Sequence, residues 1–467
     1  MAQTPNILLF LTDDHAQWAM GCAGNSELRT PTFDYLAQNG TRFANTFTPT
    51  PVCSPARACL LTGRLSSQHG IHDYLASGDP EINDIRWLES EKTLAQLFQA
   101  TGYQTGHFGK WHLGQDEHAA PGYDQWFSLG RDYPIPHEGP FRYGVNGRFQ
   151  TLPGRISHKI TEQAVNFLRD QDEERPFFMT VGYYATHSPW EGQSERLAAS
   201  YRNNTFADIP LDESYPFGVQ NLESLNDTRH NPREALAQYY AAVTEIDTAV
   251  GHLIDELEST GQLENTIIIY TSDHGLNCGH HGIWGKGNGT LPLNMVEESI
   301  RVPLIWYDGR LANTKPHATT LGQPVRSEYV DHLDTFLTIL DVADIDTPDK
   351  NYVGRSYQSL LHNKPIPDWR AVQFGEYGNV RMIRTSRHKL VYRYPDGPHE
   401  LFDLAADPRE MKNVFHQDET QPIVKALIGR LEAFFAKNED PANSGLRGRD
   451  LPRYNETEAW RTEKSAD

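Results

Sequence analysis

The sequence predicts an α/β fold: a large mixed, mostly parallel sheet flanked by helices, followed by a smaller C-terminal α+β subdomain. Through the first three quarters of the chain, short apolar runs typical of buried strands alternate with segments of helical periodicity. After a stretch that contains Gly and Pro at 350–367, the pattern changes to short strands and one helix. We therefore expect a main domain over 1–365 and a subdomain over 366–467.

The elements of the main domain follow from these two patterns. Buried strands are expected at 6–11, 103–108, 177–183, 266–271 and 303–307. Helices are expected at 32–37, 55–63, 92–100, 160–169, 233–258 and 329–343. Within 235–257, apolar residues recur every three or four positions, which predicts one buried stripe packed against the sheet.

The rest of the chain is less regular. Short strands are expected at 371–374, 380–384, 389–394 and 399–402, with a closing helix at 422–437. The polar end, 438–467, is expected to be a tail or an arm for a partner. Two long connections, 115–153 and 191–231, are rich in Pro, Gly, aromatic residues and Arg, and we expect them to carry specificity.

Composition excludes several classes of partner. The 467 residues include 42 Lys and Arg against 62 Asp and Glu, a net charge of -20, which argues against nucleic acid and against a long polyanion. The mean hydropathy is -0.61, and no apolar run approaches the roughly 18 residues that would suggest a membrane helix. We therefore expect no membrane contact and a small substrate. A homo-oligomer stays open.

Cysteine usage and the first residues bear on the compartment. Four cysteines are too few for a disulfide framework, and no Cys-x-x-Cys pair suggests zinc. The first strand begins within a few residues of Met1, without the pattern of a signal peptide. We therefore expect a cytoplasmic protein, or a periplasmic one if a leader has been removed.

Acidic residues follow two of the expected strands. Asp13 and Asp14 come after 6–11, and Asp273 and His274 come after 266–271. Ligands gather at the carboxyl ends of strands in such sheets, and paired carboxylates repel unless a cation neutralises them. These oxygens suit Ca²⁺ or Mg²⁺, while His274 is either a nitrogen ligand or a nearby hydrogen-bonding group. The alternative for the first pair is a helix cap beside a solvated neighbour.

Four further motifs carry reactive side chains. Cys53 opens Cys-Ser-Pro-Ala-Arg, although a lone cysteine is more often a small core residue. Lys110 and His112 stand in Gly-Lys-Trp-His-Leu-Gly, His187 in Thr-His-Ser-Pro-Trp, and Lys286 in Gly-Ile-Trp-Gly-Lys-Gly. Each motif is weak alone, but their order along the chain and their strand-like flanks favour one shared site.

In this order, the motifs resemble those of the formylglycine-dependent type I sulfatases of the alkaline phosphatase-like superfamily. The resemblance implies that a formylglycine-generating maturation enzyme oxidises Cys53 to formylglycine, whose aldehyde hydrate is the nucleophile. It also implies an alkaline phosphatase-like catalytic domain over 1–365. One departure is His274, where many sulfatases carry asparagine, whereas some sulfatases and the related phosphonate monoester hydrolases share the histidine.

The resemblance also implies a role for each side chain. Its catalytic residues are Cys53, Arg57, Lys110, His112, His187 and Lys286. Its metal ligands are Asp13, Asp14, Cys53, Asp273 and His274, for Ca²⁺ with Mg²⁺ or Mn²⁺ possible. The cations Arg57, Lys110 and Lys286 would hold the sulfate oxygens. His187, helped by Lys286, would protonate the leaving group, and His112 would take the proton of the second hydroxyl so that sulfate is eliminated.

Three functions are therefore compatible with the sequence. The first is hydrolysis of a sulfate monoester, on a small molecule or a carbohydrate. The second is hydrolysis of a phosphonate monoester or a phosphodiester by the same site. The third is a metal-stabilised binding protein whose Cys53 stays a thiol.

Overall fold

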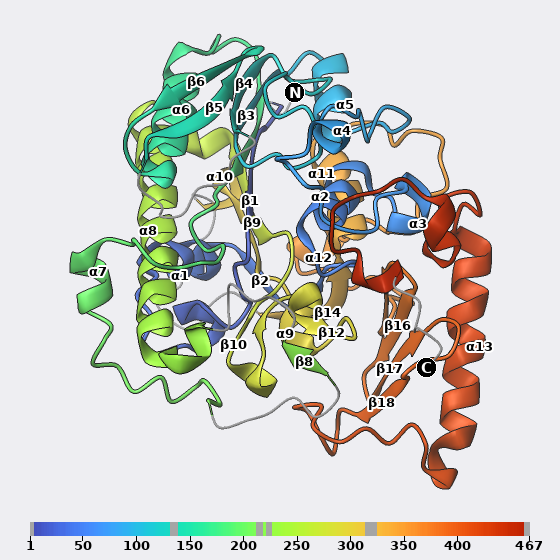
Figure 1. Ribbon diagram of the computed structural model, residues 1–467. Coiled ribbons are helices and arrows are strands. Elements are labelled where there is room, and N and C mark those ends of the chain that lie inside the picture. The colour runs from blue at the N-terminus through green and yellow to red at the C-terminus, as the bar shows by residue number, and fades with distance from the viewer. Residues whose placement is uncertain (1–3, 131–138, 212–217, 221–226, 313–324, 462–467) are drawn as a thin grey trace.

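A ten-stranded mixed sheet forms the centre of the protein (Figure 1). The computed structural model describes residues 4–130, 139–211, 218–220, 227–312 and 325–461. The strand order is β14-β2-β13-β9-β1-β7-β3-β4-β5-β6. The strands are β1 (Asn6–Thr12), β2 (Thr41–Phe47), β3 (Gln104–Gly109), β4 (Gln125–Leu129), β5 (Phe141–Val145), β6 (Arg148–Leu152), β7 (Phe177–Gly182), β9 (Thr266–Ser272), β13 (Leu304–Asp308) and β14 (Arg326–Asp331).

Strand β1 lies at the middle of the sheet and is buried along its whole length. It pairs in parallel with β9 on one side and with β7 on the other. Successive side chains point to opposite faces, so Leu8 and Phe10 enter one core while Ile7 and Leu9 enter the other. A strand covered on both faces needs a continuous apolar run, which is the pattern that the sequence shows here.

Helices cover both faces of this sheet. One core contains residues of α1 (Pro31–Asn39), α6 (Ile156–Asp170) and α8 (Pro232–Ser259). The other contains residues of α2 (Cys53–Thr62), α5 (Leu94–Ala100) and α11 (His332–Val342). The predicted buried stripe of α8 is confirmed, since Tyr239, Val243, Ile246, Val250 and Leu257 are all inaccessible to solvent. Among the described helices, none combines the length and hydropathy needed to cross a bilayer.

The C-terminal subdomain is a four-stranded antiparallel sheet with one long helix against it (Figure 1). Its strands are β15 (Val372–Tyr377), β16 (Val380–Thr385), β17 (His388–Arg393) and β18 (Glu400–Asp403). Helix α13 (Gln421–Asn438) packs on this sheet, and the rings of Phe374 and Phe434 stack with centroids 3.8 Å apart. The predicted fold class is thus confirmed. The division at 365/366 falls between α12 and β15 and stays a prediction.

Short elements complete the described chain. The helices are α3 (Ser66–His69), α4 (Pro80–Asn83), α7 (Glu195–Ala199), α9 (Glu297–Ile300), α10 (Gly309–Ala312) and α12 (Gln358–Leu361). The strands are β8 (Val219–Gln220), β10 (Asn277–Cys278), β11 (Trp284–Gly285) and β12 (Thr290–Leu291). The last three belong to the segment that carries Lys286.

Two of the expected elements are wrong in part. The connection 115–153 is no simple loop, because it contains β4, β5 and β6 of the main sheet. Strand β6 lies at the sheet edge and is largely exposed, so it lacks the apolar run that marks a buried strand. The helix expected at 329–343 begins only at His332, because Asp331 ends β14 and its carboxylate accepts hydrogen bonds from the N–H groups of Leu333 and Asp334.

The expectation that the polar end, 438–467, forms a tail or an arm for a partner is also wrong for its described part. The described part of it folds back over the main domain, with 3-10 turns at Gly445–Asp450 and Ala459–Arg461. Tyr454 has no exposed surface, and only 6% of Trp460 is exposed. Two buried aromatic residues in a polar segment are too few to produce a periodic signal, which explains why the sequence pattern missed this packing.

We predict that Gly109→Ala is more destabilising than Gly102→Ala. Both glycines have positive φ, +119° and +92°, which costs a substituted residue about 1–3 kcal/mol. A Cβ at Gly109 would lie 2.1 Å from the carbonyl oxygen of Gly182, whereas a Cβ at Gly102 would meet nothing within 4 Å. The free energy of unfolding from denaturant titration should therefore decrease from wild type to Gly102→Ala and again to Gly109→Ala. Equal losses of stability in the two variants would show that the close approach of β3 to β7 at Gly109 adds no cost beyond that of the positive φ.

Candidate active site

The candidate site lies where β1 and β9 end and α2 begins. Asp13 and Asp14 follow β1, and Asp273 and His274 follow β9. Because these strands pair in parallel with Thr12 opposite Ser272, both acidic segments leave the sheet at the same edge. Cys53 is the first residue of α2 and points at them. The site therefore sits at the carboxyl edge of the sheet, as the sequence predicts.

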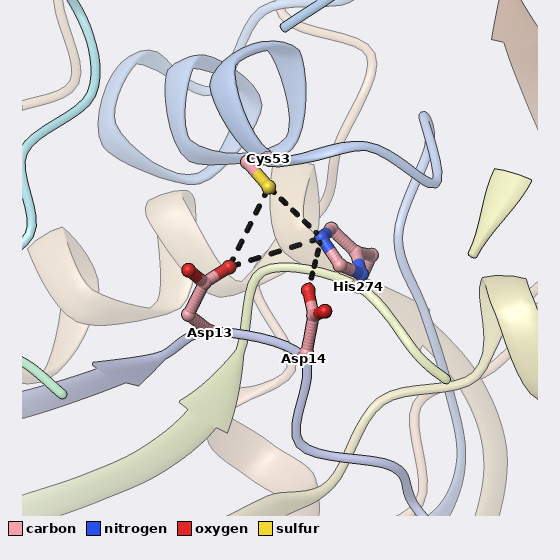
Figure 2. Close-up of side chains that lie close together, drawn as sticks. All are labelled: Asp13, Asp14, Cys53 and His274. Atoms are coloured by element: carbon pink, nitrogen blue, oxygen red, sulfur yellow. Dashed lines mark hydrogen bonds and ion pairs between the residues drawn. The ribbon is translucent and has the colours of Figure 1, made fainter. Parts of the chain in front are cut away.

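Four of the predicted side chains converge in this place (Figure 2). The sulfur of Cys53 lies 3.5 Å from Oδ1 of Asp13 and 3.3 Å from Nε2 of His274. The same His274 nitrogen lies 3.2 Å from Oδ1 of Asp14. All four residues are buried, and one ligand atom of each lies within 4.8 Å of the others.

This cluster fits a divalent cation. Carboxylate oxygens from Asp13 and Asp14 supply hard ligands, and a buried carboxylate pair needs a neutralising charge. Nδ1 of His274 donates to the carbonyl of Gly275 at 2.9 Å, since a carbonyl oxygen only accepts. Nε2 is therefore the nitrogen that can bind a metal in exchange for the proton it carries beside the carboxylates, and the bond to Gly275 holds the ring orientation.

Asp273, the fifth predicted ligand, has a different set of contacts. Its Oδ2 accepts a hydrogen bond from Nε of Arg57 at 2.9 Å, while its Oδ1 lies 3.4 Å from Nε2 of His274. Burial raises the pKa of Asp273 to about 7, although His274 and Arg57 act in the opposite direction. Burial would lower the pKa of His274, but Asp273 and the other anions raise it to about 9.

The backbone at the site is held in an unusual conformation. Asp14 and His112 have positive φ, 55° and 61°, although neither is glycine. Such residues cost about 1–3 kcal/mol and persist only where surrounding structure holds them. Around Asp13, the N–H donates to the carbonyl of Tyr183 at 3.0 Å and the hydroxyl of Thr186 donates to the carbonyl of Asp13. The acidic segment is thus fixed before any ligand binds.

Two lysines face the anions of the site. Nζ of Lys286 lies 2.6 Å from Oδ1 of Asp14 and 3.0 Å from the sulfur of Cys53. Lys110 forms an ion pair with Asp13, and both lysines are buried. Burial would raise the pKa of Cys53, but Lys110, Lys286 and His274 lower it well below its ordinary value. The site therefore stabilises an anion at the position of Cys53.

Arg57 lies one helical turn after Cys53, and its guanidinium forms hydrogen bonds with other groups of the protein. Besides the bond to Asp273, its Nη1 donates to the carbonyl of Lys110 at 2.8 Å. It thereby joins α2 to the ends of β9 and β3. The predicted contact of Arg57 with a sulfate oxygen stays a prediction.

The two predicted catalytic histidines lie in different surroundings. His112 is buried beside Cys53, and its pKa is lowered to about 4 by burial and by Lys110. His187 is only partly buried, and its ring stacks on Tyr184 with centroids 4.9 Å apart. The preceding residue, Thr186, donates its hydroxyl to the carbonyl of Asp13, which places His187 beside the cluster. His112 is thus neutral at pH 7, and His187 is the more accessible of the two.

Three polar residues that the sequence did not single out hold the backbone around Lys286. Nδ2 of Asn294 donates to the carbonyl of Lys286 at 2.9 Å, and Nδ2 of Asn277 donates to the carbonyl of Gly285 at 3.1 Å. Both side chains also bond the hydroxyl of Ser299, at 2.7 and 2.8 Å. All three are fully buried. An isolated Asn or Ser carries no local signal of such a contact, so sequence reasoning had nothing to find.

Comparison with known proteins places this geometry among sulfatases. The family model described as Sulfatase matches residues 5–345, and one described as N-sulphoglucosamine sulphohydrolase, C-terminal, matches residues 279–437. The N-acetylglucosamine-6-O-sulfatase of Bacteroides thetaiotaomicron is 30% identical, covering 92% of this chain and 86% of that protein. The ulvan-active sulfatase of Formosa agariphila is 29% identical, covering 97% of this chain and 84% of that protein.

Solved structures agree with these relatives. A structure described as a complex with the substrate D-glucosamine-2-N,6-O-disulfate superposes with a TM-score of 0.79 at 27% identity, covering 94% of this chain and 99% of that one. The phosphonate monoester hydrolase of Agrobacterium radiobacter superposes with a TM-score of 0.69 at 21% identity, covering 93% and 96%. At that lower identity the likeness shows the shared fold alone.

We predict that Lys110→Met strongly destabilises the metal-free protein. Removing Lys110 leaves Asp13 buried without its ion-pair partner, a change that costs about 3–5 kcal/mol. The control is Lys159→Met, which breaks an ion pair with Glu162 in which the two side chains are 25% and 51% exposed and should cost at most about 1 kcal/mol. The measurement is the free energy of unfolding in a chelating buffer. A loss at Lys110 no larger than at Lys159 would contradict the prediction.

Proposed function

Because this chain belongs to the sulfatase family of the alkaline phosphatase-like superfamily and therefore hydrolyses sulfate esters, we propose that it desulfates a sulfated sugar with a formylglycine made from Cys53. The environment of Cys53 carries the proposal. Its sulfur is buried within 3.0–3.5 Å of Lys286, Asp13 and His274. Members of this family are generally dependent on formylglycine and a metal. The proposal requires a formylglycine-generating enzyme as a partner during maturation.

The lysines supply the electrostatic part of catalysis. A sulfate ester is an anion, and charge grows on the leaving oxygen as the sulfur–oxygen bond breaks. Lys110 and Lys286 are already aligned at the nucleophile position, so no reorganisation is needed during the reaction. Arg57 holds α2 and Asp273 in place and adds a third positive charge to the site.

Proton transfer falls to the two histidines. The formylglycine hydrate supplies one hydroxyl for attack on sulfur and a second whose deprotonation releases sulfate. Neutral His112 beside Cys53 takes that second proton. His187, which is the more exposed histidine, donates a proton to the departing alcohol, and Lys286 assists it.

The residues Asp13, Asp14, Cys53 and His274 would hold a divalent cation, with Asp273 behind them. When bound, the cation supplies positive charge that favours the ionised nucleophile. We propose Ca²⁺ first, because oxygen ligands dominate the set. The nitrogen of His274 makes Mn²⁺ the alternative, with Mg²⁺ third.

Relatives support a sugar as the carrier of the sulfate. The two curated relatives described above are named for N-acetylglucosamine 6-O-sulfate and for ulvan, and one solved structure holds a sulfated glucosamine. The net charge of -20 favours a short substrate over a long polyanion. We therefore place a sulfated monosaccharide or short oligosaccharide ahead of aryl and choline sulfates.

We predict that protein produced with a maturation enzyme carries formylglycine at position 53 and hydrolyses sugar sulfates. Peptide mass spectrometry reads the modification, and sulfate release is compared among N-acetylglucosamine 6-sulfate, an aryl sulfate, choline sulfate and a phosphonate monoester. Cys53→Ala should abolish turnover, because it has no oxygen nucleophile. Faster turnover of the phosphonate than of the sulfates would favour hydrolysis of phosphonate monoesters as the function. An unmodified thiol at position 53 in active protein would contradict the proposed nucleophile.

We predict that Asp14→Asn reduces the bound metal of the purified protein. The substitution removes one anionic ligand from the cluster while preserving the size of the side chain. Elemental analysis after extensive dialysis measures metal content and identity. The control is Glu298→Gln in the second carboxylate cluster, where Glu298 bonds His281 at 2.6 Å. Loss of metal from Glu298→Gln but not from Asp14→Asn would show that the ion binds at the cluster of Glu298 and His281, and would contradict the prediction.

A further inference from the structure

The C-terminal segment 443–460 forms hydrogen bonds with the loop 70–76, which reaches the candidate site through Leu75. In Figure 1 this red segment passes beside α3, and the N–H of Asp440 donates to the carbonyl of Ser67 at 2.9 Å. The segment supplies neither a metal ligand nor a predicted catalytic residue. Its contacts with the loop therefore need a separate explanation.

Five positions of the loop bond this segment. Gly70 accepts from the hydroxyl of Tyr454 at 2.5 Å, and the ring of His72 donates to the carbonyl of Asn443 at 2.7 Å. The remaining contacts join Asp73 to Trp460 at 3.1 Å, Tyr74 to Asn455 at 2.9 Å, and Ala76 to Tyr454 at 2.9 Å.

Leu75 differs from these five positions, because both of its backbone groups turn toward the site. Its N–H donates to the hydroxyl of Ser54, the neighbour of Cys53, at 3.0 Å. Its carbonyl lies 2.8 Å from Nε2 of His112. A carbonyl only accepts, so Nε2 carries the hydrogen and Nδ1 is left as the basic nitrogen of the neutral ring. Leu75 thus sets both the tautomer and the orientation of His112.

We propose that the segment 443–460 positions His112, through Leu75, for the step that releases sulfate. This inference rests on the proposed function. In that step Nδ1 of His112 takes the proton of the free hydroxyl, the carbonyl double bond re-forms, and the carbon–oxygen bond to sulfate breaks with its electron pair leaving on sulfate. Asn455 and Trp460 are positioning residues, since they act on His112 only through the loop.

Side-chain contacts of Asn455 make it a suitable point of attack. Its Nδ2 donates to the carbonyl of Tyr74, and its Oδ1 accepts from the N–H groups of Thr457 and Glu458 at 2.9 Å. Asn413 offers a matched control in the C-terminal subdomain. Its Nδ2 donates to the carbonyl of His399 at 2.9 Å, and its Oδ1 accepts from two backbone N–H groups.

The experiment compares Asn455→Ala with Asn413→Ala in the full-length, matured protein. We expect Asn455→Ala to slow release while bond cleavage continues, so that kcat and KM fall together by about 10- to 100-fold and kcat/KM stays near wild type. Rapid mixing should show a burst of alcohol equal to the enzyme present, and quenched protein should carry one added SO₃. Asn413→Ala should show neither change.

A second variant keeps the test independent of folding at Asn455. Trp460→Phe removes the N–H that bonds Asp73 but retains an aromatic ring, and it should give a smaller burst of the same kind. Wild-type kinetics in both variants, or a loss of kcat/KM without a burst, would overturn the inference. A third variant, His112→Ala, tests the proposed function separately. A burst of alcohol in His112→Ala would support the role of His112 in sulfate release. No burst in His112→Ala would refute that role, independently of the result for Asn455→Ala.

Discussion

Balance among buried charges is the constraint on which the rest of the site depends. Acidic groups at the ends of β1 and β9 are removed from water, which is costly unless each has a partner. The anionic and cationic members face one another at hydrogen-bond distances; they are Asp13, Asp14, Asp273 and Cys53 on one side and Arg57, Lys110, His274 and Lys286 on the other. Any change of charge here therefore alters stability.

Each cation of this cluster arrives on a different part of the chain. Arg57 comes from the second turn of α2, Lys110 from the end of β3, and Lys286 from a segment held by Asn277 and Asn294. The positive φ of Asp14 and His112 shows that the backbone is bent to bring these groups together. The helix α2 and the strand β3 hold the charged residues, and short strained connections at Asp14 and His112 fix the direction of the chain around the site.

The C-terminal part of the chain contributes to the site without entering it. Tyr377 of β15 donates to Asp73 at 2.6 Å and also packs against the position of Gly287, next to Lys286. Lys389 of β17 pairs with Glu297 and Glu410, which joins the subdomain to the helix that follows the Lys286 segment. The subdomain therefore helps to support the candidate site, although most of its own core is separate.

The sequence by itself determined the fold class, the buried central strands and the motifs whose residues meet at the candidate site. Fully buried strands and an amphipathic helix leave local patterns, and the reactive residues stand in short contiguous motifs. Only the tertiary structure decided the strands β4–β6 on one side of the sheet, the packing of the C-terminal segment, the partners of Arg57 and the orientation of His112. Strand β6 is largely exposed and lacks the apolar run of a buried strand. The other three depend on contacts between separate segments of the chain, such as Asn455 with Tyr74. Such contacts are made by single polar groups, which have no periodicity, so a local pattern does not contain them.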